Sequence, residues 1–183
     1  MTKFILHGGG EMQRNKKHEE SFKEFIRSLP NEAKILVVYF AVEDELVSKK
    51  HLTYKRYFED LAGDKELELK IASKENFIEE LRWADGVYFR GGDTNLLLDQ
   101  VRKYPNFKEE LLKKDLVFGS SAGVYFLSQF SLSSRRGVIY EGLGVLPIKV
   151  NCHYQEGKDI SALDDYPGEL LLLKEEEYQI IEI

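Results

Sequence analysis

Residues 116–127 read Leu-Val-Phe-Gly-Ser-Ser-Ala-Gly-Val-Tyr-Phe-Leu, and this stretch decides the fold. The apolar run at its start predicts a short buried strand, and the apolar residues after Gly123 predict a helix. Between them stands Gly-x-Ser-x-Gly, the pattern of a nucleophile elbow, whose tight turn presents the central serine. The glycines at both ends let the strand and the helix approach closely. The pattern predicts Ser121 as a nucleophile; the alternative is a small-residue turn that a serine caps.

The helix that starts after Ser121 has a chemical consequence of its own. The first main-chain N–H groups of a helix have no partner within it, and the helix dipole places partial positive charge there. An oxyanion that forms beside the serine hydroxyl would accept a hydrogen bond from such a group. The amide of Ala122 is therefore the first candidate for an oxyanion hole.

Strands and helices alternate around this stretch. Short apolar or alternating runs predict strands at 4–6, 34–42, 67–71, 86–89 and 116–118. Apolar residues at helical spacing predict helices at 17–29, 54–61, 77–81, 96–101 and 107–112, with Gly63 and Ser73 as candidate caps. After residue 137 the pattern changes to short β-like pieces at 138–140, 145–150, 170–173 and 178–183. We expect an α/β fold, a three-layer sandwich with a mostly parallel sheet and helices on both faces.

Length and composition predict one domain that spans residues 1–183. With 43% apolar and 32% charged residues, the chain can bury a core and keep a solvated surface. Its net charge of -6 opposes nucleic acid or an anionic membrane as the main partner. The longest apolar stretches are too short to cross a membrane. The single cysteine, Cys152, and a first segment without an apolar leader favour a cytoplasmic location.

A nucleophilic serine needs a general base, and the chain has four histidines. His18 falls on the polar side of a predicted helix, His51 opens another helix among lysines, and His7 ends the first strand. His153 follows the apolar run at 145–150 and comes after the serine in chain order, as the base does in elbow enzymes. We expect His153 to be the base; the alternative is a solvated loop histidine.

Two glycine-rich stretches follow predicted strands. The stretch 90–94 reads Arg-Gly-Gly-Asp-Thr, and Asp93 and Thr94 cap the next helix, so the amide of Gly92 is a second candidate for the oxyanion hole. The alternative is a simple strand-to-helix turn. The three glycines at 8–10 indicate a phosphate or nucleotide site only weakly, because they match neither Gly-x-Gly-x-x-Gly nor a P-loop with its lysine.

Three motifs in this order resemble those of the serine peptidase family that contains peptidase E and cyanophycinase. They are Gly-Gly-Asp at 91–93, Gly-x-Ser-Ala-Gly at 119–123, and Gly-Leu-Gly-Val-Leu-Pro at 142–147 leading to Cys-His-Tyr at 152–154. The resemblance spans most of the chain and implies a fold like that of class I glutamine amidotransferases. It implies Ser121 as nucleophile, His153 as general base and the amides of Gly92 and Ala122 as oxyanion hole, without metal or cofactor. It also implies that short peptides, dipeptides among them, are hydrolysed through an acyl-enzyme.

The acid that orients the histidine departs from the peptidase E pattern. Peptidase E has an aspartate shortly after the elbow helix, whereas residues 131–136 contain no acid. Cyanophycinase has a glutamate in a late segment, and Leu-Lys-Glu-Glu at 173–176 stands about where that family has Leu-Pro-Glu-Gly. We therefore expect Glu175 to be the acid, and Glu141 and Asp159 are the second choices. The alternative is an ordinary solvated acidic turn.

Two further departures concern the substrate. Arg90 stands where peptidase E has a glycine, and the chain ends soon after the acidic turn, where relatives usually continue with further strands. A net charge of -6 repels an acidic peptide, so such a substrate would need local cations, of which Arg90, Arg135 and Arg136 are nearest to the site in sequence. Arg90 and Asp93 are our candidate substrate contacts.

Two functions from different classes follow from these residues. One is a serine peptidase, monomeric or homodimeric, that acts on short peptides; the other is a catalytically silent amidotransferase-like domain that binds a ligand or partner. The missing peptidase E acid favours the silent domain, whereas the retained serine, histidine and glycine turns favour the enzyme. Glutamine amidotransferase chemistry is excluded, because it uses cysteine at the elbow, where this chain has Ser121.

Overall fold

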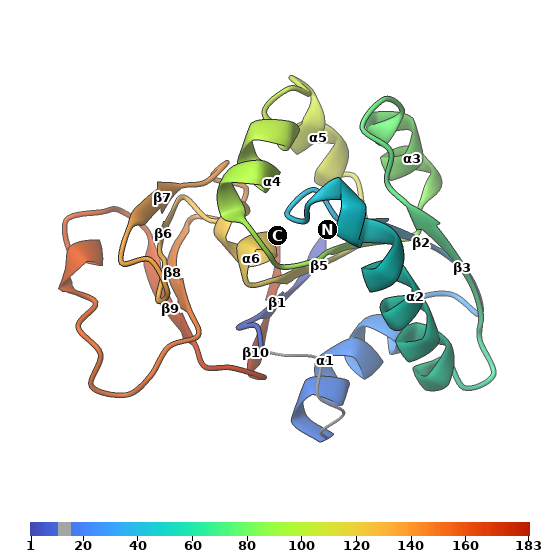
Figure 1. Cartoon of the computed structure of the whole chain (residues 1–183), viewed down its shortest axis with the longest axis horizontal. Coiled ribbons are helices and arrows are strands. Elements are labelled where there is room, and N and C mark those ends of the chain that lie inside the picture. Colours follow the sequence, from blue (N-terminus) through green and yellow to red (C-terminus); the bar gives the residue numbers. More distant parts are fainter. Residues whose placement is uncertain (11–15) are drawn as a thin grey trace.

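A twisted six-stranded sheet forms the centre of the computed structural model, which describes residues 1–10 and 16–183, with only the main chain at 16 and 17 (Figure 1). In sheet order its strands are β10 (Tyr178–Glu182), β1 (Lys3–His7), β5 (Leu116–Ser120), β4 (Gly86–Phe89), β2 (Glu32–Val38) and β3 (Glu66–Ile71). All neighbouring pairs are parallel except β10 with β1. Because β1, β5 and β4 are adjacent, the loops after their carboxyl ends meet at one place, where parallel sheets bind ligands.

Helices cover both faces of this sheet, which confirms the predicted α/β sandwich (Figure 1). On one face lie α1 (Lys16–Arg27) and α2 (Asp44–Leu61). On the other lie α3 (Phe77–Trp83), α4 (Thr94–Val101), α5 (Phe107–Leu111) and α6 (Ala122–Tyr125). Alternate residues of each strand supply the two cores: Ile5 packs toward α1 and α2, whereas Phe4 and Leu6 pack toward the other helices.

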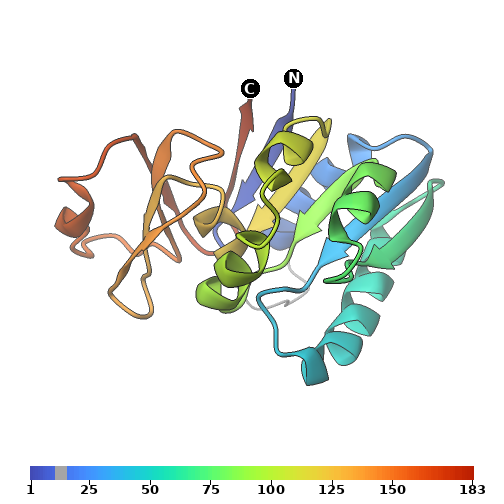
Figure 2. The same cartoon turned by 90° about the horizontal axis from the view of Figure 1, so that it is seen from above.

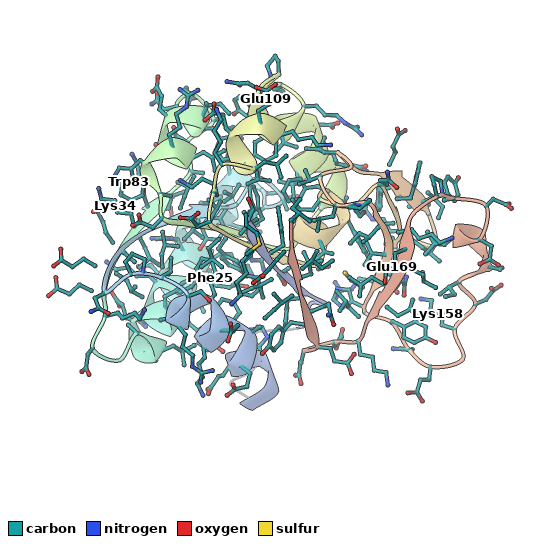
Figure 3. The ribbon with its side chains drawn as sticks, turned by 180° about the vertical axis from the view of Figure 1, so that it is seen from behind. Phe25, Lys34, Trp83, Glu109, Lys158 and Glu169 are labelled. Atoms are coloured by element: carbon teal, nitrogen blue, oxygen red, sulfur yellow. The ribbon has the colours of Figure 1, made fainter. Side chains whose placement is uncertain are left out.

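The core under α1 and α2 is built mainly from aromatic rings. Phe22 of α1 packs against Phe118 of β5 and Tyr88 of β4, with ring centroids 4.9 and 5.3 Å apart. Phe25, one helical turn further along, lies between α1 and the sheet (Figure 3). These rings fix α1 over the strand that leads to Ser121.

A second, four-stranded sheet stands beside the first, and the sequence did not predict it as a separate sheet (Figure 2). Its strands, in order, are β7 (Ile139–Glu141), β6 (Phe130–Leu132), β8 (Ile148–Cys152) and β9 (Glu169–Leu173). A short 3-10 helix, η1 (Ser161–Leu163), lies in the connection between β8 and β9. Because β8 and β9 are parallel, the residues that follow them emerge at the same edge.

The structure differs from the local predictions in several places. The strand predicted at 34–42 ends at Val38, because the chain then turns, with the Val42 N–H donating to the Tyr39 carbonyl. The residue before α3 is Asn76 rather than Ser73, whose hydroxyl instead accepts the Asn76 N–H at 3.1 Å. β6 was not predicted at all. Gly63, by contrast, has the expected left-handed conformation, with φ of 62°.

None of the helices in the described part of the chain combines the length and the apolar character that a membrane span requires.

Candidate active site

Ser121 occupies a tight turn between the end of β5 and the start of α6. Its backbone has φ of 50° and ψ of -104°, a conformation that costs a non-glycine residue about 1–3 kcal/mol. The Ser121 N–H donates to the His7 carbonyl of β1 at 2.9 Å, and the Ser121 carbonyl accepts the N–H of Val124 at 2.8 Å. Both ends of the strained residue are therefore held by neighbouring elements.

The glycines of the motif are required by close contacts between main chains. A Cβ at Gly119 would lie 2.4 Å from the Gly123 carbonyl oxygen, and a Cβ at Gly123 would lie 2.4 Å from the Phe89 carbonyl oxygen. Larger residues at either position would push α6 away from β5 and β4. The spacing of the two glycines thus sets the depth at which Ser121 is presented.

His153 and Glu175 meet Ser121 from the second sheet. The Ser121 Oγ lies 2.9 Å from His153 Nε2, and His153 Nδ1 lies 2.9 Å from Glu175 Oε1. His153 follows directly after β8, and Glu175 follows shortly after β9, so the parallel pairing of these strands places them side by side. The side chain of His153 is 12% exposed and that of Glu175 is 58% exposed.

The hydrogen bonds define the form of the imidazole that suits catalysis. An ionised carboxylate can only accept, so Glu175 favours the tautomer with its proton on Nδ1. Nε2 then carries a lone pair and accepts the hydroxyl proton of Ser121. This arrangement makes the serine a latent nucleophile with an adjacent base.

Backbone strain is concentrated around these side chains. Among the described residues, the non-glycine residues with positive φ are Ser121, His153 and Glu176, with φ of 50°, 55° and 66°. Glu176 directly follows the glutamate that contacts the histidine. Such conformations persist where surrounding structure holds them, and they cluster at functional sites.

The three glycines at 8–10 form the floor beneath the histidine. The Gly8 carbonyl accepts the His153 N–H at 3.1 Å, and the Gly9 carbonyl accepts the Glu176 N–H at 2.8 Å. The loop's own donors are also engaged, because the Gly8 N–H donates to the Glu177 carbonyl at 2.8 Å and the Gly9 N–H to His7 Nδ1 at 3.2 Å, so neither is free to bind a phosphate. The loop instead binds the two segments that carry the histidine and the acid.

The two residues proposed for the oxyanion hole belong to segments that adjoin Ser121. Ala122 starts α6, and a Cβ at Gly91 would lie 3.2 Å from the Ser121 Cβ, so the Gly91–Gly92 turn is immediately adjacent. Gly92 has φ of 156° and packs so tightly that a Cβ would lie 2.1 Å from the Ala41 carbonyl oxygen. Neither the Gly92 nor the Ala122 amide donates a hydrogen bond to any residue that the structure describes.

A pocket of about 700 Å³ opens in front of Ser121, a size typical of ligand sites. Four cationic residues line it: Lys50, Arg90, Arg135 and Arg136. The Arg90 guanidinium lies 5.7 Å from the ring centre of Tyr54 and donates to the Gly91 carbonyl. Lys50 and Tyr54 come from α2, about 70 residues before the elbow in the chain, and no sequence signal connected them with the site.

Asp93 has less freedom to contact a substrate than the sequence suggested. Its Oδ1 accepts the N–H groups of Asn95 and Leu96 at the start of α4, and its Oδ2 accepts from Arg136 at 2.7 Å. These hydrogen bonds lower the pKa of the Asp93 carboxyl, whereas partial burial opposes that shift. The ion pair joins the Gly91–Gly92 turn to the segment between β6 and β7.

None of the other three histidines hydrogen-bonds the Ser121 hydroxyl, and two of them differ from expectation. His18 is buried against Phe22 rather than on a polar face. His51 lies within α2 rather than at its start, with Nδ1 3.4 Å from the Tyr39 hydroxyl. His7 ends β1 as predicted and is fully buried.

The two reserve acids lie outside the hydrogen bonds of His153. Glu141 is exposed on β7, and the Asp159 carboxylate accepts the Ser161 N–H at 2.9 Å beside η1. Within residues 1–10 and 16–183, no three His, Cys, Asp or Glu side chains are grouped so that they could hold a metal ion.

Comparisons with known proteins bear on this geometry. None of the curated proteins matches the chain significantly. Among solved structures, a peptidase from an acI-B1 Actinobacterium matches with a TM-score of 0.68 and 21% identity, over 100% of this chain and 84% of that one. A protein designated peptidase E from Listeria monocytogenes EGD-e matches with a TM-score of 0.65 and 18% identity, over 100% and 99% of the two chains. At these identities the likeness shows the fold.

The match to a family of sequences goes further than the structural likeness. The sequence pattern of peptidase family S51 matches residues 4–181, which include the elbow, the histidine and the acidic turn. The chain therefore belongs to peptidase family S51, a family of serine-type peptidases.

Proposed function

We propose that this enzyme hydrolyses short peptides through an acyl-enzyme formed on Ser121. The observation that carries the proposal is the continuous pair of 2.9 Å hydrogen bonds from Ser121 through His153 to Glu175. A silent binding domain has no chemical use for a strained serine, a base and an acid in this order. The absence of an acid from residues 131–136, which favoured the silent domain, is answered by Glu175.

In the first half of the reaction, His153 Nε2 removes the hydroxyl proton as Ser121 Oγ attacks the peptide carbonyl carbon. Glu175 stabilises the imidazolium that forms. The imidazolium then donates its proton to the leaving amine, and the amine departs as the carbonyl reforms in the acyl-enzyme. In the second half, His153 takes a proton from water, the hydroxide equivalent attacks the ester, and Ser121 regains its proton.

The amides of Gly92 and Ala122 stabilise the negative oxygen of both tetrahedral intermediates. Ala122 directly follows Ser121, the Gly91–Gly92 turn packs beside it, and the N-terminus of α6 adds the positive end of its dipole. Donors that are already fixed before the reaction need no reorganisation when charge develops. Gly92 is held in place by the Ala41 main chain, which also accepts the Asp93 N–H at 2.8 Å.

The pocket supports a small, anionic substrate of dipeptide length. Its volume of about 700 Å³ admits a few residues, and its four cationic side chains face one carboxylate, Asp93, that is already paired. The carboxylates of a bound peptide would pair with these cationic side chains and balance their excess positive charge. We place Arg90 at the substrate because it lines the pocket next to the Gly91–Gly92 turn.

We also propose that the enzyme acts in the cytoplasm. Its one cysteine, Cys152, is free and fully buried, so the fold does not depend on a disulfide and is compatible with a reducing compartment.

The proposal is tested by a serine-directed fluorophosphonate probe and a dipeptide panel. We expect the probe to label Ser121, with labelling abolished in Ser121→Ala and retained in Ser133→Ala, another pocket serine. Dipeptides with an acidic residue should be cleaved faster than neutral ones of the same size. A label that maps to Ser120, or that persists in Ser121→Ala, would contradict the assignment.

A further inference from the structure

His7, a histidine that the proposed reaction does not use, lies directly behind the nucleophile. It is fully buried at the end of β1, and its carbonyl accepts the Ser121 N–H. Its Nδ1 lies 3.2 Å from the Gly9 main-chain nitrogen and 3.1 Å from the Ser120 Oγ. The ring thus faces polar groups of the loop after β1 and of the last residue of β5.

These contacts define the protonation of the ring. A main-chain N–H can only donate, so Nδ1 must accept from Gly9, and the ring proton is on Nε2. Burial, followed by the neighbouring His18 and His153, lowers the pKa of His7 to about 3. At neutral pH the ring is therefore uncharged and keeps its acceptor.

Gly9 connects this ring to the reacting groups. A Cβ on Gly9 would lie 2.4 Å from His153 Cε1, 2.6 Å from His153 Nε2 and 3.1 Å from the Ser121 Cβ. The imidazole of His153 therefore rests directly on the Gly9 main chain. The Gly9 carbonyl also accepts the Glu176 N–H, next to the acid.

We propose that His7 is a positioning residue, whose Nδ1 anchors the Gly9 N–H and the Ser120 hydroxyl and so fixes the surface that aligns His153 with Ser121. The inference rests on the proposed function, because it assigns His7 a task in the same site. It makes the glycine loop a working part of the site through its main chain.

An apolar residue could fill the space of His7 but could not accept these hydrogen bonds. The Gly9 N–H would then be buried without an acceptor, and the loop would relax toward other partners. Gly9 has φ of 93° and touches three segments, so a shift there moves the His153 ring relative to the hydroxyl. An asparagine, in contrast, carries an acceptor oxygen close to the position of the histidine Nδ1.

The experiment compares His7→Leu with His7→Asn in the full chain. The rate of labelling by the fluorophosphonate probe, the kcat and KM for a cleaved dipeptide, and the melting temperature are measured for each. We expect His7→Leu to lower the labelling rate and kcat by about 10-fold or more at unchanged KM, because small misplacements of reacting groups have large effects. His7→Asn should restore most of the lost rate, which a role in packing alone would not predict.

A nuclear magnetic resonance measurement tests the proposal without relying on activity. It is needed if a variant folds poorly or if the wild type proves inactive. The contact between the His153 ring proton on Cε1 and the Gly9 α-protons should be observed in wild type and His7→Asn, and lost in folded His7→Leu. If His7→Leu does not fold, a His7→Asn protein that keeps both the contact and the rate still supports the proposal. Loss of the rate in well-folded His7→Asn overturns it.

Failure of the two proposals can be told apart. If the wild type is neither labelled nor active, the proposed function fails, and the ring contact alone decides the role of His7. If the wild type is labelled and folded His7→Leu reacts at the same rate, the positioning role is refuted and the proposed function stands.

Discussion

Replacing Glu175 by glutamine removes the charge that faces His153 Nδ1 and keeps the size of the side chain. The carboxylate lies 2.9 Å from Nδ1, within normal hydrogen-bond distance. Its replacement therefore weakens the preference for the Nδ1-protonated tautomer and the stabilisation of the imidazolium that forms during attack. In a buried triad the equivalent change from acid to amide lowers kcat by about 10⁴-fold.

The exposure of Glu175 reduces this magnitude. Its side chain is 58% exposed, so water screens its charge, and the glutamine amide can rotate to present its oxygen to Nδ1. We therefore expect Glu175→Gln to lower kcat by about 10²-fold, which is about 2.7 kcal/mol in the barrier. KM should change little, because Glu175 does not line the substrate pocket.

The assay is steady-state cleavage of a dipeptide, with two matched controls of equal charge change. Glu177 accepts the Lys174 N–H, and Glu156 pairs with the Lys174 ammonium; neither contacts His153. Glu177→Gln and Glu156→Gln should keep the wild-type kcat. If Glu175→Gln behaved like these controls, Glu175 would not orient the histidine, and the site would work as a serine and histidine alone.

Three other experiments test the base, the buried His7 and the contact of Arg90 with the substrate. His153→Gln should abolish turnover and His51→Gln should not, because the reaction needs the imidazole of His153 as its base; equal damage from both would mean that the base is misassigned. The pKa of His7 is about 3 in the folded protein and 6.5 in the unfolded chain. As the pH falls from 6.5 toward 3, the unfolded chain therefore binds a proton at His7 before the folded protein does. This lowers the free energy of unfolding, by about 2 kcal/mol at pH 5. Urea unfolding should show a larger loss of stability on acidification in wild type than in His7→Asn, in which the lowered pKa values of His18 and His51 still contribute, and parallel curves would refute the contribution of His7. Arg90→Met should raise KM for an acidic dipeptide more than for a neutral one, and an equal rise for both would remove Arg90 from recognition.

Much of this fold could be predicted from local sequence patterns. The alternation of strands and helices up to residue 120 is repeated in the structure, because each buried strand or amphipathic helix shows its own period. β6, with three residues, is too short to show a period, and the second sheet depends on pairings between distant segments.

The candidate site also has parts that the sequence predicted and parts that it could not predict. Ser121 sits in a local motif, the place of His153 after the apolar run at 145–150 indicated the base, and the resemblance supplied Glu175; the structure brings all three together. The α2 wall of the pocket, with Lys50, and the contact of Gly9 with the histidine depend on tertiary packing, which leaves no mark within a short window of sequence. His18 was misplaced because helical period alone could not show that α2 covers it.

The role of Ser121 as the residue that carries the acyl group can be tested by trapping the acyl-enzyme. The enzyme is mixed with an activated ester of a short acidic acyl group, quenched in acid, and analysed by intact mass and by peptide mapping. We expect one acyl group per chain, on Ser121, that is absent in Ser121→Ala and forms more slowly in Glu175→Gln. An acyl group on another residue, or turnover by Ser121→Ala at the wild-type rate, would contradict it.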